Sequence, residues 1–215
     1  MNKELTELVI VIDRSGSMSN MAEEVNGAIN RLIDEQKALP GECRVTLVQF
    51  DDIYEVVHDN VDIRNVLKYT CIPRGSTALL DAVGKAINTV GERLAKTPEN
   101  QRPGLVSVII ATDGMNNASK EFTLEQIKEM VTRQQEVYKW HFNFLGAQID
   151  AYAASYGMNF AHQNVSNVGK GKFKNAVKYY SGKLGATRGK TRDGEIVTSN
   201  AFAYTAAEKA DLENS

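Results

Sequence analysis

An apolar run that ends abruptly in a carboxylate and two hydroxyls constrains this chain more than any other feature. Residues 8–12 form a short run rich in β-branched side chains, which is typical of strands buried on both faces of a parallel sheet. Asp13, Ser15 and Ser17 follow at alternating positions, and Gly16 permits a tight turn between the serines. Because open α/β sheets bind ligands just beyond the carboxyl ends of their strands, this junction predicts a ligand site in an α/β fold.

Two further segments extend this pattern. Thr77 stands just before residues 79–94, whose apolar side chains recur at helical spacing, and residues 106–112 form a second buried strand that leads into Asp113. Each polar residue alone is typical of turns and helix caps. Together, in this order and at two strand ends, they favour a metal site, since two neighbouring carboxylates without a cation repel each other. The candidate ligands are all oxygen donors, which suit a hard cation better than zinc or copper: Asp13, Ser15, Ser17, Thr77 and Asp113.

The remaining periodicity predicts a doubly wound α/β sheet, mostly parallel, with one antiparallel edge strand and helices on both faces. Thr123 and Gln126 form a capping box at the start of one of these helices. The other predicted elements are a first helix ending near residue 39, a strand over 44–50 with an antiparallel partner over 54–58, a strand over 140–147, a short helix over 151–156 and a last strand over 160–165.

Length and composition indicate one domain in a reducing compartment. The chain has 215 residues, and no apolar run approaches the roughly 20 residues that span a bilayer. Residues 2–4 lack the basic-then-apolar layout of a signal peptide. Cys43 and Cys71 are the only cysteines, and we expect both to be free thiols. These features predict a cytoplasmic protein that does not engage membranes.

The order and spacing of the candidate ligands resemble those of the von Willebrand factor type A domain. The resemblance rests on D-x-S-x-S after the first strand, a distal threonine before a helix, and T-D-G after the fourth strand, and it covers roughly residues 5–156. In that family these residues form a metal-ion-dependent adhesion site. By resemblance, the two aspartates and three hydroxyls bind Mg²⁺, with Mn²⁺ or Ca²⁺ as alternatives, and a carboxylate of a protein partner completes the coordination shell.

The resemblance also bears on partners and on the rim of the site. Intracellular members of the family often act beside AAA+ ATPases or in stress and defence systems, so such a partner, presenting Asp or Glu, is expected here. Many other members are extracellular adhesion modules, and the predicted cytoplasmic location argues against that role. The rim that contacts the partner is predicted to comprise Arg14, Gly75, Ser76, Gly114, Asn116 and Asn117.

Catalysis has little support in the sequence. The G-x-S-x-G motif of a serine hydrolase is absent, and none of the three histidines, His58, His141 and His162, has an obvious partnership with Ser15 or Ser17. No phosphate-binding glycine motif follows a strand. We therefore expect a binding protein with no catalytic residues.

The C-terminal region is expected to lie outside the domain. Residues 170–192 carry eight basic side chains and no acidic one, whereas residues 193–215 carry five acids and one lysine. Glycine, threonine and basic residues dominate from residue 182 onward, which predicts a domain over residues 1–182 and a mobile tail over residues 183–215.

The basic run also supports an alternative function. A solvated helix face is the simpler interpretation. However, Phe173, Tyr179 and Tyr180 alternate with lysines, as on surfaces that bind single-stranded nucleic acid by stacking and charge. The candidate nucleic-acid contacts are Lys170, Lys172, Lys174 and Lys178.

Overall fold

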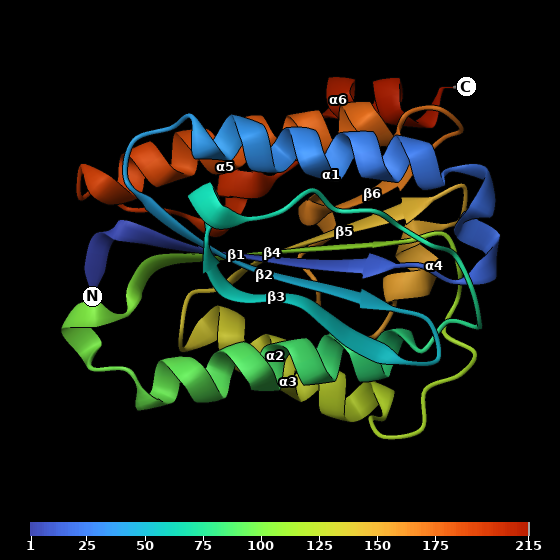
Figure 1. Cartoon of the computed structure of the whole chain (residues 1–215), viewed down its shortest axis with the longest axis horizontal. Coiled ribbons are helices and arrows are strands. Elements are labelled where there is room, and N and C mark those ends of the chain that lie inside the picture. The colour runs from blue at the N-terminus through green and yellow to red at the C-terminus, as the bar shows by residue number, and fades with distance from the viewer. Residues whose placement is uncertain (215) are drawn as a thin grey trace.

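The computed structural model, which describes residues 1–214, has a central six-stranded sheet between two layers of helices (Figure 1). The strand order is β3-β2-β1-β4-β5-β6. All neighbours are parallel except β2 and β3, which form an antiparallel hairpin at one edge. The strands are β1 (Asn2–Asp13), β2 (Glu42–Phe50), β3 (Tyr54–Asp62), β4 (Pro103–Thr112), β5 (His141–Ala147) and β6 (Val165–Val168). The predicted fold class is confirmed.

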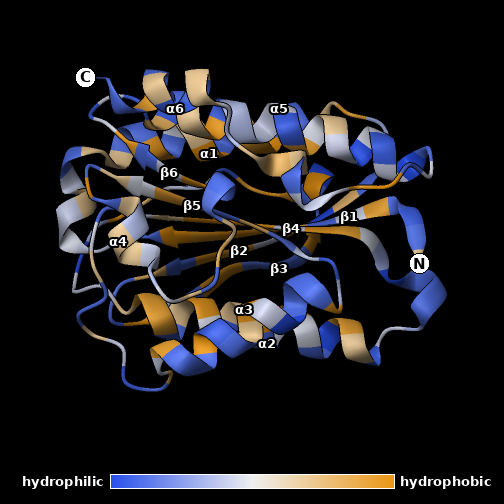
Figure 2. Cartoon of the chain, turned by 180° about the vertical axis from the view of Figure 1, so that it is seen from behind, coloured by the Kyte–Doolittle hydropathy of each residue, from blue (hydrophilic) through white to orange (hydrophobic). Residues whose placement is uncertain are grey.

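Each face of the sheet packs against its own set of helices, which is why the central strands are apolar on both sides. One core includes Ile10 from β1 and Ile29 from α1, and the other includes Val11 from β1 and Val83 from α2. Figure 2 shows the apolar strands enclosed between the two helical layers. The helices are α1 (Ala22–Lys37), α2 (Leu79–Lys96), α3 (Leu124–Glu136), α4 (Ala151–Ser155), α5 (Phe173–Arg192) and α6 (Ala206–Glu213).

Capping side chains define the starts of three helices, α3, α4 and α6. The capping box at α3 is confirmed, because Thr123 accepts from the backbone N–H of Gln126 while the Gln126 side chain accepts from the Thr123 backbone. The prediction of a last strand over residues 160–165 is wrong, because residues 162–164 form a 3-10 turn and β6 begins only at Val165. The Phe160 ring, in the loop before this turn, packs against Phe142 and Phe144 with ring centroids 5.7 Å apart.

The predicted boundary after residue 182 is corrected by the structure. It falls in the middle of α5, which continues to Arg192 along α1, and α6 follows. Leu184, Phe202 and Leu212 are completely buried in the same core as α1. Residues 183–214 are therefore part of the folded unit and not a tail.

Polar contacts reinforce this packing of α5 on α1. The Arg188 guanidinium is buried and donates to the backbone oxygen of Gln36 at 2.7 Å, next to the C-terminus of α1. A positive charge at this helix end interacts favourably with the helix dipole. The Gln36 side chain donates in turn to the Ser181 backbone oxygen at 2.9 Å.

No helix within residues 1–214 has the length and apolar character that a membrane span requires.

We predict that truncation after Gly182 abolishes cooperative thermal unfolding. The deletion removes Leu184, Phe202 and Leu212 from the core. Loss of a buried phenylalanine side chain alone costs about 3–5 kcal/mol, which is comparable to the ~5–15 kcal/mol that stabilises a typical domain. Differential scanning calorimetry of the truncated and full-length proteins provides the measurement.

Removal of only the last two residues serves as the control and should leave the melting temperature within a few degrees of that of the full chain. A cooperative transition at an unchanged temperature in the protein truncated after Gly182 would contradict the assignment of residues 183–214 to the fold.

Candidate functional site

The candidate ligands gather where the chain reverses its winding direction across the sheet. From β1 the chain proceeds outward to β2 and β3, and then returns to the other side of β1 to form β4. Asp13 ends β1, and Asp113 directly follows β4, which pairs with β1 in parallel. In doubly wound sheets this switch point opens a crevice at the strand ends. For this reason the two carboxylates lie together at the C-terminal ends of the strands.

The turn over residues 14–17, which we call the serine turn, connects the two carboxylates through short contacts. The backbone N–H of Ser15 donates to Asp13 Oδ1 at 2.6 Å. The hydroxyls of Ser15 and Ser17 lie 3.0 Å apart, and Ser17 Oγ donates to Asp113 Oδ1 at 2.7 Å. Four of the five candidate ligands therefore form one continuous chain of contacts. Ser17, the third member of this chain, is exposed to solvent.

Thr77, the fifth candidate, lies beside the Asp113 loop. A Cβ atom added to Gly114 would come within 2.9 Å of Thr77 Oγ1, so a side chain there would force the Thr77 hydroxyl to move. The Thr77 backbone oxygen accepts from the N–H groups of Asn117 and Ala118 at 3.0 and 3.1 Å. The structure thus places the threonine next to the loop that carries the second carboxylate.

Burial makes the two carboxylates electrostatically unfavourable when they are ionised. It raises the pKa of Asp13 to about 6, against the opposing effect of hydrogen bonds from Thr112 and Ser15. Burial also raises the pKa of Asp113, which a hydrogen bond from Ser17 partly offsets. Among the ion pairs of residues 1–214, none involves either carboxylate. Asp113 in turn adds a like-charge contribution to the raised pKa of Asp13.

Arg14 does not supply the missing positive charge, although it is adjacent to Asp13 in sequence. Its Nε donates to Asp51 Oδ2 at 3.0 Å, and its Nη2 lies 2.8 Å from Glu55 Oε2. Arg74 Nε also contacts Asp51 Oδ2, at 2.7 Å. Burial alone would raise the Asp51 pKa, but these arginines and a backbone N–H donor hold it below its usual value.

Asp51 is the residue that the sequence analysis missed in this region. Arg14 was predicted on the rim, but the structure buries it, because its guanidinium braces the turn after β2. Asp51 also joins the loop before α2, since its backbone oxygen accepts from the Ala78 N–H at 2.8 Å. Glycine is required at position 75, because its φ of +69° is unfavourable for other residues and because a Cβ there would clash with Asp52 Oδ1.

The other predicted rim residues combine exposure with structural contacts. Gly75, Ser76, Asn116 and Asn117 are exposed, and Gly114 is partly buried. Asn117 Oδ1 accepts from the Thr77 N–H at 2.9 Å. Asn117, which was predicted to contact the partner, thus joins the Asp113 loop to the Thr77 loop.

A second set of hydrogen bonds between the Asp113 loop and α2 was not predicted. Asp81, in the first turn of α2, accepts from the backbone N–H groups of Lys120, Glu121 and Phe122 at 2.8–2.9 Å. Ser119 Oγ accepts from the Asp81 N–H at 3.1 Å. The loop that begins at Asp113 is therefore tied to the N-terminal end of α2 over most of its length.

The donor set fits a hard divalent cation. Its members are two carboxylates that lack a basic partner and three hydroxyls, of which that of Ser17 contacts Asp113. Residues 1–214 contain no cluster of three or more His, Cys, Asp or Glu side chains that could hold a metal ion. A cation at this edge would consequently depend on hydroxyl as well as carboxylate oxygens, as Mg²⁺ and Ca²⁺ readily do.

The predicted nucleic-acid surface is not formed. Phe173 and Tyr180 are buried, and Tyr180 is in hydrogen-bond contact with Ser107 at 2.8 Å. Tyr179 is partly buried and donates to Asp211 at 3.0 Å. Lys172 forms an ion pair with the same carboxylate at 3.1 Å, whereas the other three candidates are exposed: Lys170, Lys174 and Lys178. The aromatic rings that were predicted to stack on bases pack into or against the core, because α5 packs on the sheet.

Comparison with known proteins agrees with this description. The sequence model of the von Willebrand factor type A domain family matches residues 7–180 of the chain. A search of curated proteins gave no match.

Several solved structures share the fold. Proximal thread matrix protein 1 from the mussel byssus, with a zinc-occupied MIDAS motif, superposes with a TM-score of 0.61 at 17% identity over 84% of this chain. The vWF domain of the type V pili tip protein from Porphyromonas gingivalis gives 0.60 at 12% identity, covering 85% of this chain and 95% of that one. The pilus adhesin of Lactobacillus rhamnosus GG gives 0.60 at 14% identity, covering 85% of this chain and 30% of that one. The present chain spans 46% of the mussel protein, so it corresponds to part of that relative.

We predict that replacing Asp13 by asparagine separates the two roles of this carboxylate. Without divalent cations, Asp13→Asn should melt at the same or a higher temperature than the native chain, because one of two desolvated carboxylates is gone. Mg²⁺ at a hundred times its Kd should stabilise the native chain by about 2.7 kcal/mol and the variant hardly at all. Thermal melts in EDTA and in Mg²⁺ measure both effects.

Asp52→Asn is the matched control. Asp52 is an exposed acid on the neighbouring turn, and its substitution should preserve the response to Mg²⁺. Equal stabilisation of the Asp13→Asn variant and the native chain would show that the cation binds elsewhere.

Proposed function

This chain belongs to the von Willebrand factor type A family, and from that premise we propose that it is a non-catalytic, Mg²⁺-dependent protein-binding module. The observation that carries the proposal is the pair of buried carboxylates at the adjoining ends of β1 and β4, which have hydroxyl neighbours but no basic partner. Members of this family often bind ligands through a metal ion at such a site.

The residues that would hold the ion are Asp13, Ser15, Ser17, Thr77 and Asp113. When bound, Mg²⁺ would offer a positively charged coordination position to an acidic side chain of a partner. The serine turn would orient its two hydroxyls through the hydrogen bond from Ser15 N–H to Asp13. The hydrogen bonds of Asn117 and Asp81 would keep Thr77 close to the Asp113 loop. Strict octahedral preferences of Mg²⁺ would make the placement of the partner carboxylate selective.

The surroundings of the site suit contact with a protein. Ser17, Ser76 and Met115 are exposed on three loops that meet there, and the Met115 side chain adds an apolar surface. Arg74 remains half exposed while it holds Asp51, so its guanidinium can meet further acidic groups. The shared fold with a pilus adhesin of Lactobacillus rhamnosus GG supports a role in binding for this chain.

The absence of catalysis is part of the proposal, and the contacts of the serine hydroxyls support it. Ser15 and Ser17 contact each other and Asp113, and no imidazole contacts them within residues 1–214. His141 packs against Phe202 at the start of β5, and His162 stacks on Tyr152. A serine nucleophile needs a base within hydrogen-bond reach.

We predict that Thr77→Ala weakens partner binding at least about tenfold while it changes the melting temperature by only a few degrees. Loss of one ion ligand reduces the hold on the partner carboxylate, whereas the backbone bonds of Thr77 persist. The measurement is capture of proteins from an extract of the native cell on the immobilised chain, in Mg²⁺ and then in EDTA.

Thr70→Ala provides the control, since Thr70 is exposed on the segment that leads to the site. Captured proteins should be released by EDTA and retained by the Thr70→Ala variant. Capture that survives EDTA, at a temperature where the chain is folded, would contradict a partner-completed ion.

A further inference from the structure

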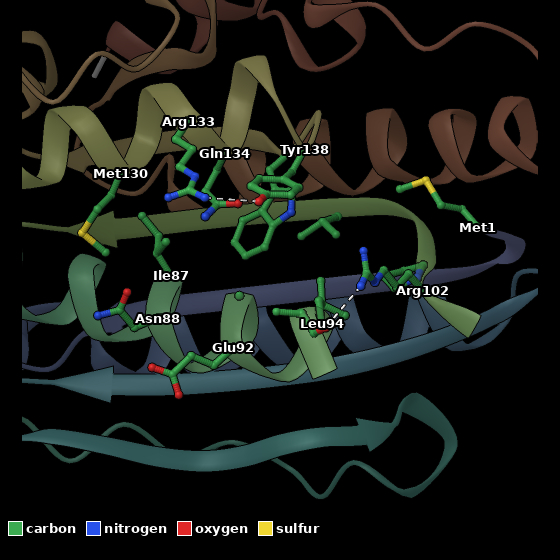
Figure 3. A pocket seen from close by; sticks show the side chains of 15 residues that line it. Met1, Ile87, Asn88, Glu92, Leu94, Arg102, Met130, Arg133, Gln134 and Tyr138 are labelled. Atoms are coloured by element: carbon green, nitrogen blue, oxygen red, sulfur yellow. Dashed lines mark hydrogen bonds between the residues drawn. The ribbon is translucent and has the colours of Figure 1, made fainter. Parts of the chain in front are cut away.

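A cavity of about 480 Å³ lies between α2 and α3 (Figure 3), near the N-terminal ends of β4 and β5, whereas the ion site lies at the C-terminal ends of β1 and β4. It opens beside the start of β4 and the residues just before β5. Its volume falls in the range of small-molecule sites, which is about 300–1,000 Å³. We propose that this cavity is a binding site for a small amphipathic carboxylic acid, independent of the ion site and of the function proposed above.

Small residues on α2 create the space. Gly91 and Ala95 line the cavity, and the atom nearest to a Cβ placed on Gly91 would be Gln134 Nε2, at 3.8 Å. A larger side chain at position 91 could therefore enter the cavity without a clash. Well-packed interiors do not leave such a volume between two helices, so the cavity is available to a ligand or to water.

The inner wall is apolar and aromatic. Ile87 and Val106 are buried and line it together with Trp140, which is 5% exposed. The indole N–H of Trp140 donates to no group within residues 1–214, which leaves it available to a ligand acceptor. Tyr138, which is 42% exposed, lines the opening. These walls suit a ring-sized apolar body.

Two guanidinium groups without carboxylate partners give the cavity its preference for an anion. Arg102 is held by its Nε, which donates to the Thr97 backbone oxygen at 2.8 Å, and by Nη2, which donates to the Ala95 backbone oxygen at 3.2 Å. Arg133 extends over the Tyr138 ring, 5.9 Å from its centroid. Figure 3 shows Arg102 and Arg133 on different sides of the cavity.

Neither arginine forms an ion pair within residues 1–214, and the one acidic lining residue, Glu92, is exposed and pairs with neither. Arg102 is already ordered by backbone carbonyls, so a ligand carboxylate would bind it at little entropic cost. Charge-assisted hydrogen bonds of this kind favour a carboxylate over a neutral amide of the same shape. The cavity thus combines one anchored cationic group with an apolar wall.

The test uses 4-phenylbutanoate as the probe and its neutral amide, 4-phenylbutanamide, as the isosteric comparison. Trp140 is the only tryptophan in the chain, so its fluorescence reports directly on the cavity. The full chain is used with any affinity tag at its C-terminus, because Met1 lines the cavity. We expect saturable binding of the acid with a Kd on the order of 0.1–1 mM, and at least about tenfold weaker binding of the amide.

Three variants locate the binding. Gly91→Leu should fill the cavity and abolish binding in a folded protein, and Arg102→Gln should weaken binding of the acid at least about tenfold without affecting the amide. Lys96→Gln is the charge-matched control, since Lys96 is exposed at the end of α2 and does not line the cavity, and it should bind as the native chain does. Absence of saturable binding, equal binding of acid and amide, or undiminished binding by Gly91→Leu would each overturn the proposal.

Discussion

Two carboxylates held in a desolvated position without a cationic side chain are the constraint around which the site is organised. Asp13 and Asp113 reach the same edge because β1 and β4 are parallel neighbours at the point where the winding reverses. Burial raises the pKa of each, and the nearest arginine in sequence, Arg14, is engaged by Asp51 and Glu55. An unpaired charge of this kind is costly in a protein interior, and a divalent cation bound there would relieve that cost.

The loops around these carboxylates are fixed by interactions that are separate from the proposed ligands. Asp51 joins the β2–β3 turn to the serine turn and to the segment before α2. On the other side, Asn117 and Asp81 fasten the Asp113 loop to α2. Because these contacts use none of the side-chain oxygens proposed to hold the ion, they would keep the loops in position whether or not an ion is bound, which would lower the cost of ordering the ligands on binding.

The sequence predicted the strand ends and missed the braces for a physical reason. Buried strands and polar residues at their ends are local patterns, so Asp13 and Asp113 could be located from spacing alone. Asp51 acts on residues 23 and 37 positions away, which no local pattern reveals. The second half of α5 was predicted to be a tail because of its glycines. However, a Cβ on Gly185 would lie 2.9 Å from Leu39 Cδ1, so this glycine lets α5 pack closely against the turn that follows α1.

The position of a bound cation is the most direct test of the central claim. Crystals of the full chain grown with Mn²⁺ in place of Mg²⁺ would reveal the ion by its anomalous scattering. The account predicts one strong peak within about 2.5 Å of the Ser15 and Ser17 hydroxyl oxygens, bordered by Asp13, Thr77 and Asp113. No peak there at saturating Mn²⁺, or a peak only at another acidic surface, would contradict it.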